Sequence, residues 1–539
     1  MNAHKLILNF GIVLACVSVP SCTDYLTAPE PSTTLVKDFY NSSAAAIQNV
    51  TACYVPLMWE FNNTYFSEWF IGDIMSDDAL KGGQNTSDMG ASYDMENWKT
   101  TSTNTLLLDF YRAQYQGIGR CNLALANLPE MQCDDAAWTS KLQNRLIGEA
   151  CFLRAYYYFR LLRVFGGTPI STKVIDSSED WQQPRASVED MFMRILADLE
   201  EANTRLWTIA ELSKDKTQIG RATKGAAQAM LMKTYLYMAS PYWNKQISQD
   251  AETCYQLAKA WGDSVITSNM YSLCPDYHDN FTLLGENGPE SVFEIQYMEI
   301  PWGDYGEGYG YTAGSFTQVL TRSRSTKKGG GWGFNHPTQN LYDEFEPTDT
   351  IRLGEAIYNP ADSLIENESQ EIYLGSRYLN NKYAMYEEYP EGWDLHASRG
   401  PLNNKQIRYA DVLLMYAEAC LNSGDEATAI AFINEVRERV HLPEVGKYTI
   451  KINGVEITSP TTEQLLKHER RMELAMEGHR WFDLVRWGNT KQHMDAYAAT
   501  ESEEAKAQMA AFVEGKHEIF PIPDEERELN PMPQNNGYN

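Results

Sequence analysis

The residues best suited to ligand chemistry are aromatic side chains interleaved with glycines. Residues 303–333 hold nine glycines, against about two expected from the composition of the whole chain. Glycine lets the backbone turn and approach a ligand closely, while aromatic rings offer flat apolar platforms with polar edges. The candidate ligand contacts in and beside this segment are Tyr297, Trp302, Tyr305, Tyr309, Tyr311 and Trp332.

Ring stacking combined with hydrogen bonding suits a sugar, which has an apolar C–H face and a rim of hydroxyls. One ring that buries roughly 80 Å² of apolar surface contributes about 2 kcal/mol, whereas association costs about 4 kcal/mol or more. Three or so rings with polar partners are therefore needed for measurable binding of one oligosaccharide. The alternative is that these rings form a hydrophobic cluster that holds a glycine-rich loop against the protein.

Charged side chains add two further candidate contacts. Asp73 could accept hydrogen bonds from sugar hydroxyls, or bind a cation together with Asp77 and Asp78, but their spacing is not that of a calcium loop. We therefore expect a solvated acidic loop there and predict no metal site. A group of four cations could receive an acidic sugar or a peptide carboxylate, or simply form an exposed loop: Arg322, Arg324, Lys327 and Lys328.

No sequence pattern marks a catalytic constellation. His468 and Glu469 are followed by Met472 where a zinc-binding HExxH motif has its second histidine, and GxSxG and GxxxxGK patterns do not occur. We therefore predict a binding protein without enzymatic activity and without a cofactor. A glycosidase carboxylate pair stays open, because only its separation in space identifies it, and so does a helical scaffold that binds proteins alone.

Long helices must position these loops. Apolar residues recur at three-and-four spacing over 147–162, 222–240 and 409–421. Apolar side chains also occur on the other helix faces, which is typical of helices packed between neighbours. Small and large residues alternate in the first stripe as in tetratricopeptide-like helix pairs, so we predict a mostly α-helical solenoid interrupted by insertions.

The remaining segments predict a loop-rich portion and a closing helix. Residues 271–405 are rich in Gly, Tyr, Asn and Pro, with one strand-like run at 292–297, and residues 60–103 are also irregular. We expect loops and small sheets laid over the helices. A single helix is predicted over 462–488, in which Arg480, Asp483 and Arg486 stand three apart and can form an ion-pair ladder.

The N-terminus carries a targeting pattern. Lys5 precedes an apolar run, Leu6 to Val19, that is too short to span a bilayer, and small residues lead to Cys22 as in a bacterial lipobox. We expect residues 1–21 to be a signal peptide, and 22–36 to be a tether acylated at Cys22 that anchors one domain, 37–539, to a membrane. The formal net charge of −28 disfavours nucleic acid as a partner.

Several motifs, in order along the chain, resemble those of the SusD/RagB family of outer-membrane nutrient-binding lipoproteins. The N-terminal motif is Ser21-Cys22-Thr23-Asp24-Tyr25-Leu26. The others are 148–155 with 165–169, 220–227, 407–419 and 477–488, followed by Phe520-Pro521-Ile522-Pro523 and the segment 530–538. The resemblance therefore spans almost the whole chain after residue 21.

This resemblance implies a fold and a role. It implies a tetratricopeptide-like α-solenoid with four helix pairs and an irregular, small-β half that binds ligand, arranged here as helical repeats at 37–270, an insert at 271–405 and C-terminal helices at 406–539. It also implies a location on the outer face of the outer membrane of a Bacteroidetes-type bacterium. The implied partner is a SusC-like TonB-dependent barrel, to which oligosaccharides or, in some members, peptides are delivered.

One more candidate rests on the resemblance. Trp98 occupies a position that resembles the family's sugar-stacking loop. Its alternative role is a hydrophobic staple at the entry of a helix that we expect from residue 105.

Overall fold

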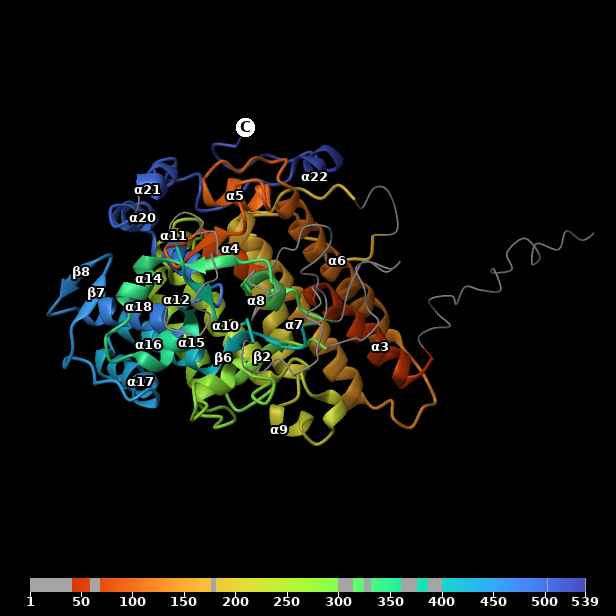
Figure 1. Ribbon diagram of the computed structural model, residues 1–539. Helices are drawn as coiled ribbons and strands as arrows, with labels where there is room; N and C mark the ends of the chain where they lie inside the picture. Colours follow the sequence, from red (N-terminus) through yellow and green to blue (C-terminus); the bar gives the residue numbers. More distant parts are fainter. Residues whose placement is uncertain are drawn as a thin grey trace, which may run out of the picture.

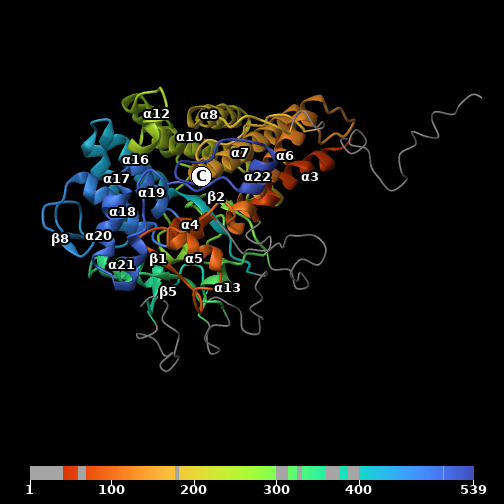
Figure 2. The same ribbon diagram turned by 90° about the horizontal axis from the view of Figure 1, so that it is seen from above.

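Helices dominate the structure, a computed structural model that describes residues 41–58, 68–175, 181–298, 314–323, 331–359, 376–385, 400–501 and 503–538. The long helices follow one another side by side in chain order, as Figures 1 and 2 show. They are α3 (Ser43–Tyr54), α6 (Thr105–Asn127), α7 (Ser140–Phe165), α8 (Val188–Arg205), α10 (Lys224–Ala239), α12 (Ala251–Ile266), α16 (Tyr409–Asn422), α17 (Glu426–Arg439) and α18 (Thr462–Glu473). This array confirms the predicted α-solenoid.

Local sequence sets where these helices begin. The Asn104 side chain accepts hydrogen bonds from the first turn of α6, and Thr139 and Thr223 cap α7 and α10 in the same way. Ser187 and Asp190 form a capping box at the start of α8. Helix α7 is buried on all sides from residue 145 to 165, because it packs between α6 and α8.

The irregular portion of the fold, which is built from both ends of the sequence, lies along one side of the helical array, as Figure 2 shows for α4, α5, β1, β5 and α13. Its short helices are α4 (Glu68–Ile74), α5 (Gly90–Glu96), α13 (Thr317–Thr321), α14 (Gln339–Glu344), α15 (Thr350–Ala356), α19 (Arg480–Trp487), α20 (Thr490–Ala498), α21 (Glu503–Met509) and α22 (Asp524–Leu529). Single-turn segments complete the described helical elements: η1 (Val55–Met58), η2 (Leu128–Glu130), α9 (Ile209–Leu212), η4 (Lys216–Gln218), α11 (Pro241–Asn244) and η5 (His278–Phe281).

The described residues form four two-stranded antiparallel sheets, of which the first two join segments far apart in the sequence and the last is a local hairpin. They are β1 (Ala79–Gly82) with β3 (Phe334–Pro337), β2 (Ser291–Ile295) with β6 (Asn404–Arg408), β4 (Ile357–Tyr358) with β5 (Leu379–Asn380), and β7 (Ile450–Ile452) with β8 (Val455–Ile457). The strand predicted at 292–297 is therefore β2, two residues shorter at its end. Its register pairs Ser291 with Arg408 and Ile295 with Asn404.

The prediction of one helix over 462–488 is wrong, because the chain breaks between α18 and α19. Met476 and Gly478 both adopt positive φ, 63° and 76°. The break lets α4 approach the backbone closely, since a Cβ atom on Gly72 would lie 1.9 Å from the carbonyl oxygen of Gly478. An unbroken helix would not allow this contact.

The C-terminal coda closes the array. The backbone N–H of Phe520 donates to the carbonyl of Val164 at 2.8 Å. Nδ2 of Asn535 donates to the carbonyl oxygens of Phe165 and Phe520 at 2.9 and 2.6 Å. The main hydrophobic core accordingly includes residues from Ala46 to Met532.

Candidate ligand-binding site

The chain on both sides of residues 299–313 is anchored beside the β2–β6 sheet. The Tyr297 N–H donates to Oδ1 of Asn403 at 2.7 Å, and Ser315 and Gly400 exchange two backbone hydrogen bonds of 2.8 and 3.1 Å. Gly400 lies too close to the backbone for a side chain, because a Cβ atom there would lie 2.5 Å from the carbonyl oxygen of Ser315. The residues that flank the glycine-rich segment are thus held firmly.

Two of the predicted rings lie among the described residues of this region. Tyr297 is 7% exposed and belongs to the main core. Trp332 is partly buried; its N–H donates to the carbonyl of Val319 at 2.7 Å, and its ring centroid lies 6.3 Å from that of Phe316. Part of the Trp332 side chain therefore stays accessible to a ligand. The other rings of the set lie outside the described residues: Trp302, Tyr305, Tyr309 and Tyr311.

The ring of Trp98 is enclosed instead. It is 5% exposed, and its centroid lies 4.8 Å from that of Phe512, 5.4 Å from that of Trp481 and 5.7 Å from that of His517. The indole has no open face for a sugar in this position. These surroundings agree with the alternative role of Trp98 in packing. We therefore no longer count Trp98 among the candidate ligand contacts.

The expectation of a solvated acidic loop is wrong, because Asp73, Asp77 and Asp78 are each at most 1% exposed. Asp73 accepts hydrogen bonds from Nδ2 of Asn335 and from the N–H of Gly478, both at 2.9 Å. Burial raises the pKa of Asp73 to about 8, so its carboxyl is protonated at neutral pH. In this position it does not meet a sugar hydroxyl.

Asp77 and Asp78 pair with arginines of the C-terminal helices. Nε of Arg471 donates to Asp78 at 2.8 Å, and Nε of Arg480 donates to Asp77 at 2.7 Å. Nε2 of His493 lies 2.7 Å from the other oxygen of Asp77. Burial acts to raise the pKa of Asp77, but Arg471 and Arg480 outweigh it and hold that pKa well below its usual range. These carboxylates fasten the N-terminal irregular segment to α18 and α19.

The predicted ion-pair ladder is only partly formed. Nε of Arg486 donates to Asp483 at 2.7 Å, as the spacing indicated. Arg480 turns to Asp77 instead, and the second cation on Asp483 is Arg470, whose Nε donates at 3.1 Å. The broken helix explains the difference, since α18 folds back beside the start of α19.

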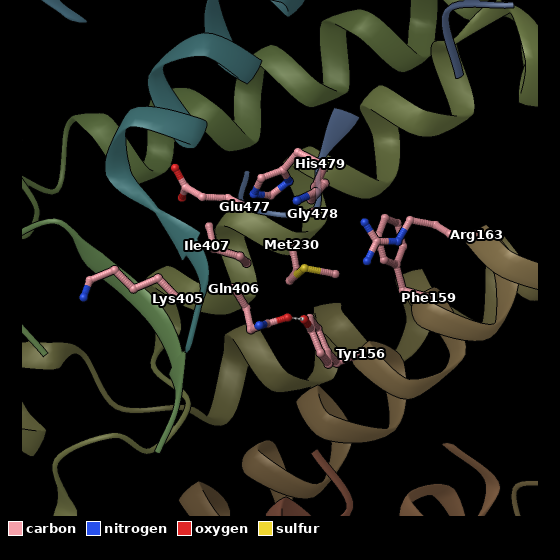
Figure 3. Close-up of a pocket in the computed structure, with 11 residues that line it drawn as sticks. Tyr156, Phe159, Arg163, Met230, Lys405, Gln406, Ile407, Glu477, Gly478 and His479 are labelled. Carbon is pink, nitrogen blue, oxygen red and sulfur yellow. Dashed lines mark hydrogen bonds between the residues drawn. The ribbon is translucent and has the colours of Figure 1, made fainter. Parts of the chain in front are cut away.

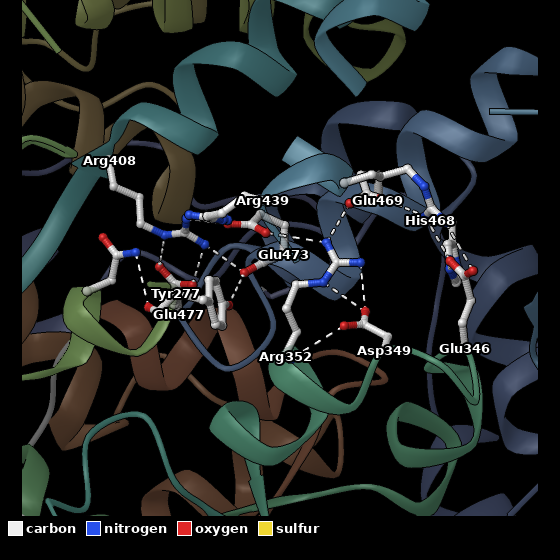
Figure 4. A network of polar contacts seen from close by, with 12 residues as sticks. Tyr277, Glu346, Asp349, Arg352, Arg408, Arg439, His468, Glu469, Glu473 and Glu477 are labelled. Carbon is white, nitrogen blue, oxygen red and sulfur yellow. Dashed lines mark hydrogen bonds and ion pairs between the residues drawn. The ribbon is translucent and has the colours of Figure 1, made fainter. Parts of the chain in front are cut away.

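A second buried ion network joins β6, α15, α17 and α18 (Figure 4). Arg408 donates from Nε to Glu477 and from Nη1 to Glu290, both at 2.8 Å. Arg352 donates from Nε to Asp349 at 2.8 Å. Burial opposes ionisation of Glu477, but Arg408 in the first place lowers its pKa to about 2. Arginines thus hold these carboxylates ionised, which suits a structural clamp rather than proton transfer.

The hollows lined by described residues include a small pocket and an open cleft. The small pocket in Figure 3 measures about 30 Å³ and has Tyr156, Phe159, Gln406 and His479 in its wall; that volume is enough for a water molecule, not for a sugar. An open cleft of about 650 Å³ runs between α7 and α8, and none of its lining residues is aromatic. Its Arg154 donates from Nη2 to Asp198 at 2.7 Å. Neither hollow offers the stacking surface expected for a sugar.

The cation group is only partly described. Arg322 is 7% exposed, and its Nη1 donates to the carbonyls of Ala384 and Met385 at 2.6 and 3.0 Å. Arg322 therefore does not belong to an exposed loop. The other three cations, Arg324, Lys327 and Lys328, lie outside the described residues.

Sequence reasoning missed one exposed ring, Trp181, which is 63% exposed. It stands in the polar run Ser177-Ser178-Glu179-Asp180-Trp181-Gln182-Gln183. A lone aromatic residue outside any apolar periodicity was the signal that could have identified it.

Among the described residues, no helix combines the length and the apolar character needed to cross a membrane. The same part of the chain holds no group of three or more His, Cys, Asp or Glu side chains placed to hold a metal ion.

Comparison with known families identifies the chain. Residues 24–236 match the family described as starch-binding and associating with the outer membrane, and residues 354–538 match the SusD family. The chain belongs to the SusD family. A SusD-like protein of Formosa agariphila is 27% identical over 506 residues, which is 89% of this chain and 90% of the relative. No enzymatic family is indicated.

Solved structures agree with this SusD-like fold. A laminarin-binding SusD-like protein superposes with a TM-score of 0.75 at 27% identity, covering 93% of this chain and 100% of that structure. Surface glycan-binding protein A from Bacteroides thetaiotaomicron, in complex with laminarihexaose, superposes with a TM-score of 0.73 at 21% identity, covering 92% and 100%. The mostly helical fold class predicted from the sequence is therefore confirmed.

Proposed function

We propose that this chain captures an oligo- or polysaccharide at the cell surface, without cleaving it, and passes it to a SusC-like TonB-dependent barrel in the outer membrane. The observation that carries the proposal is its likeness, over 93% of its length, to a laminarin-binding protein of the same fold. Trp332, beside the anchored flanks of the glycine-rich segment, is the described ring best placed to stack on a sugar.

The proposed contacts follow from the arrangement around β2 and β6. Tyr297 and Asn403 hold one flank of residues 299–313 against the sheet, and we propose Trp302, which lies outside the described residues, and Trp332 as ligand contacts. Two rings at about 2 kcal/mol each only offset an association cost of about 4 kcal/mol or more, so further rings and polar contacts must add to them. We therefore expect weak binding of a short oligosaccharide and stronger retention of a polymer, which offers many sites.

Attachment to the outer membrane is part of the proposal. Acylation of Cys22 would tether the domain through residues 23–36, and the acidic chain would gain little from anionic lipid itself. Replacing Cys22 by Ala is expected to move the protein from the membrane fraction to the soluble fraction of cells. Retention of the Cys22→Ala protein in the membrane fraction, at the wild-type level, would refute lipid anchoring.

Affinity electrophoresis tests glycan capture. The chain 23–539 is run in native gels that contain laminarin, a fructan or a polyuronate, and we expect retardation by at least one of them. Trp332→Ala and Trp302→Ala should each abolish most of that retardation, whereas Val455→Ala, at an exposed residue of β8, should not. No retardation of the wild-type chain, or the release of reducing sugar during incubation, would contradict the proposal.

A further inference from the structure

One exposed tryptophan lies outside the candidate site. Trp181 is 63% exposed and is the sole aromatic residue among the large hydrophobic side chains that the described part of the chain exposes. Leu529, at the end of α22, is exposed to the same extent, and Gln182 is exposed as well. An exposed indole costs free energy that burial would recover. A binding role at the surface would account for that cost.

The segment that follows this ring is tied to other parts of the chain. Nδ2 of Asn530, the residue after Leu529, donates to the carbonyl of Gln183 at 2.8 Å, which joins the two exposed segments. Arg185 donates from Nε to the carbonyl of Gly167 at 2.7 Å and from Nη1 to that of Pro533 at 3.1 Å. These bonds fix the chain at Gln183 and Arg185, two and four residues after the ring.

We infer that Trp181, with the amide of Gln182 and the apolar side chain of Leu529, forms a second contact for a carbohydrate chain, separate from the region of Trp332. A flat indole can stack on the C–H face of a pyranose, and side-chain amides both donate to and accept from hydroxyls. This inference rests on the proposed function and adds a second place at which one polymer is held.

The charge around this patch disfavours anionic occupants. Helix α22 carries four carboxylates and one arginine: Asp524, Glu525, Glu526, Glu528 and Arg527. Two of the carboxylates, Glu525 and Glu526, are partly neutralised by Arg112 of α6, at 3.0 and 2.6 Å. The remaining negative charge opposes anionic lipid and nucleic acid, but it does not act on a neutral sugar.

Two contacts on one polymer predict different effects on long and short ligands. Once one contact is occupied, the second meets the same chain at high effective concentration. Trp181→Ala should therefore weaken retardation by a polysaccharide such as laminarin by about tenfold in apparent affinity. It should leave the affinity of the Trp332 region for laminarihexaose unchanged within about twofold, because a short ligand occupies the two contacts independently.

The first experiment measures these two affinities for the wild-type chain 23–539, using the polysaccharide of the panel that retards it most and a hexasaccharide of the same linkage. Trp181→Phe should keep most of the affinity for the polymer because it keeps a ring, and Val455→Ala, at a residue of equal exposure, should change neither value. Unchanged polymer binding by Trp181→Ala overturns the inference, and so does an equal loss for polymer and hexasaccharide. If the wild-type chain binds no glycan, the proposed function itself fails.

The second experiment measures the solvent accessibility of the Trp181 ring. Trypsin releases the peptide 174–185, in which Trp181 is the only tryptophan and no methionine occurs. Hydroxyl-radical oxidation of this peptide should fall several-fold when the polysaccharide is present, relative to oxidation of the exposed Met270. Equal protection of Trp181 and Met270 overturns the inference, as does protection of Trp181 by a partner protein in the absence of glycan.

Discussion

Asp73 allows the electrostatics of the fold to be tested with one substitution. Its carboxyl is buried, and the pKa rises to about 8 in the folded state, whereas an unfolded chain has the ordinary value near about 4. Between these values folding takes up a proton, so stability is lost as the pH rises. Each pH unit costs about 1.4 kcal/mol, which amounts to about 4 kcal/mol between pH 4 and pH 7.

Asp73→Asn removes this titration and can keep the local hydrogen bonds. The new amide oxygen can accept from Gly478, and its NH₂ group can donate to Oδ1 of Asn335, which now has no hydrogen-bond partner, once the Asn335 amide turns over. We expect the variant to be more stable than the wild-type chain, by a margin that grows by about 1.4 kcal/mol per pH unit and levels off above about pH 8.

The assay is urea unfolding of both chains, followed by tryptophan fluorescence, from about pH 5 to about pH 8. Asp77→Asn is the matched control with the opposite sign, because Arg471 and Arg480 hold the pKa of Asp77 well below its usual range. That variant should lose about 3–5 kcal/mol. Its deficit should stay constant from about pH 5 to about pH 8, because Asp77 is ionised in both states there, and should shrink only below about pH 4, where the unfolded chain takes up the proton first. A difference between Asp73→Asn and the wild-type chain that does not vary with pH would refute the reasoning.

Three further outcomes follow from packing. Gly72→Ala should lower the urea midpoint of unfolding strongly, because its Cβ atom would meet the backbone of Gly478 at 1.9 Å. Gly90→Ala should not lower it, because a Cβ atom there meets no atom within 4 Å. Equal midpoints for the two variants would contradict the close contact. Trp98→Ala should lower the free energy of unfolding by about 3–5 kcal/mol. A loss of glycan affinity at unchanged stability would instead indicate that Trp98 contacts the ligand. Among the seven described cysteines, Cys133 should be alkylated first under native conditions and the buried thiols only in urea, as mass spectrometry of intact protein can show.

The helical framework was predictable because its signals are local. The stripes at 147–162, 222–240 and 409–421 became α7, α10 and α16. The apolar residues of each stripe lie within one helix, and Thr139 and Thr223 cap α7 and α10. The break before α19 was not predicted, although Gly478 inside an apolar pattern was a warning. What decides it is the contact with Gly72, which no local pattern reveals.

The candidate site was less predictable for the same physical reason. Whether Asp77 is solvated or buried depends on Arg480, which stands 403 positions later. Whether Trp98 stacks on a sugar or on protein depends on Trp481, Phe512 and His517. Residue type and spacing indicate what a side chain is able to do, but partners from distant segments decide which of those roles the fold leaves open.

The attachment of residues 73–78 to residues 471–480 also has a consequence for biogenesis. A polypeptide made from its N-terminus exposes Asp77 and Asp78 long before Arg471 and Arg480 emerge, so this region has no means of neutralising its buried charges until synthesis is nearly complete. Such long-range closure delays the final folding step and leaves a partly finished chain dependent on chaperones. A truncation that ends before α18 should therefore yield an aggregating fragment and not a shorter version of the same receptor.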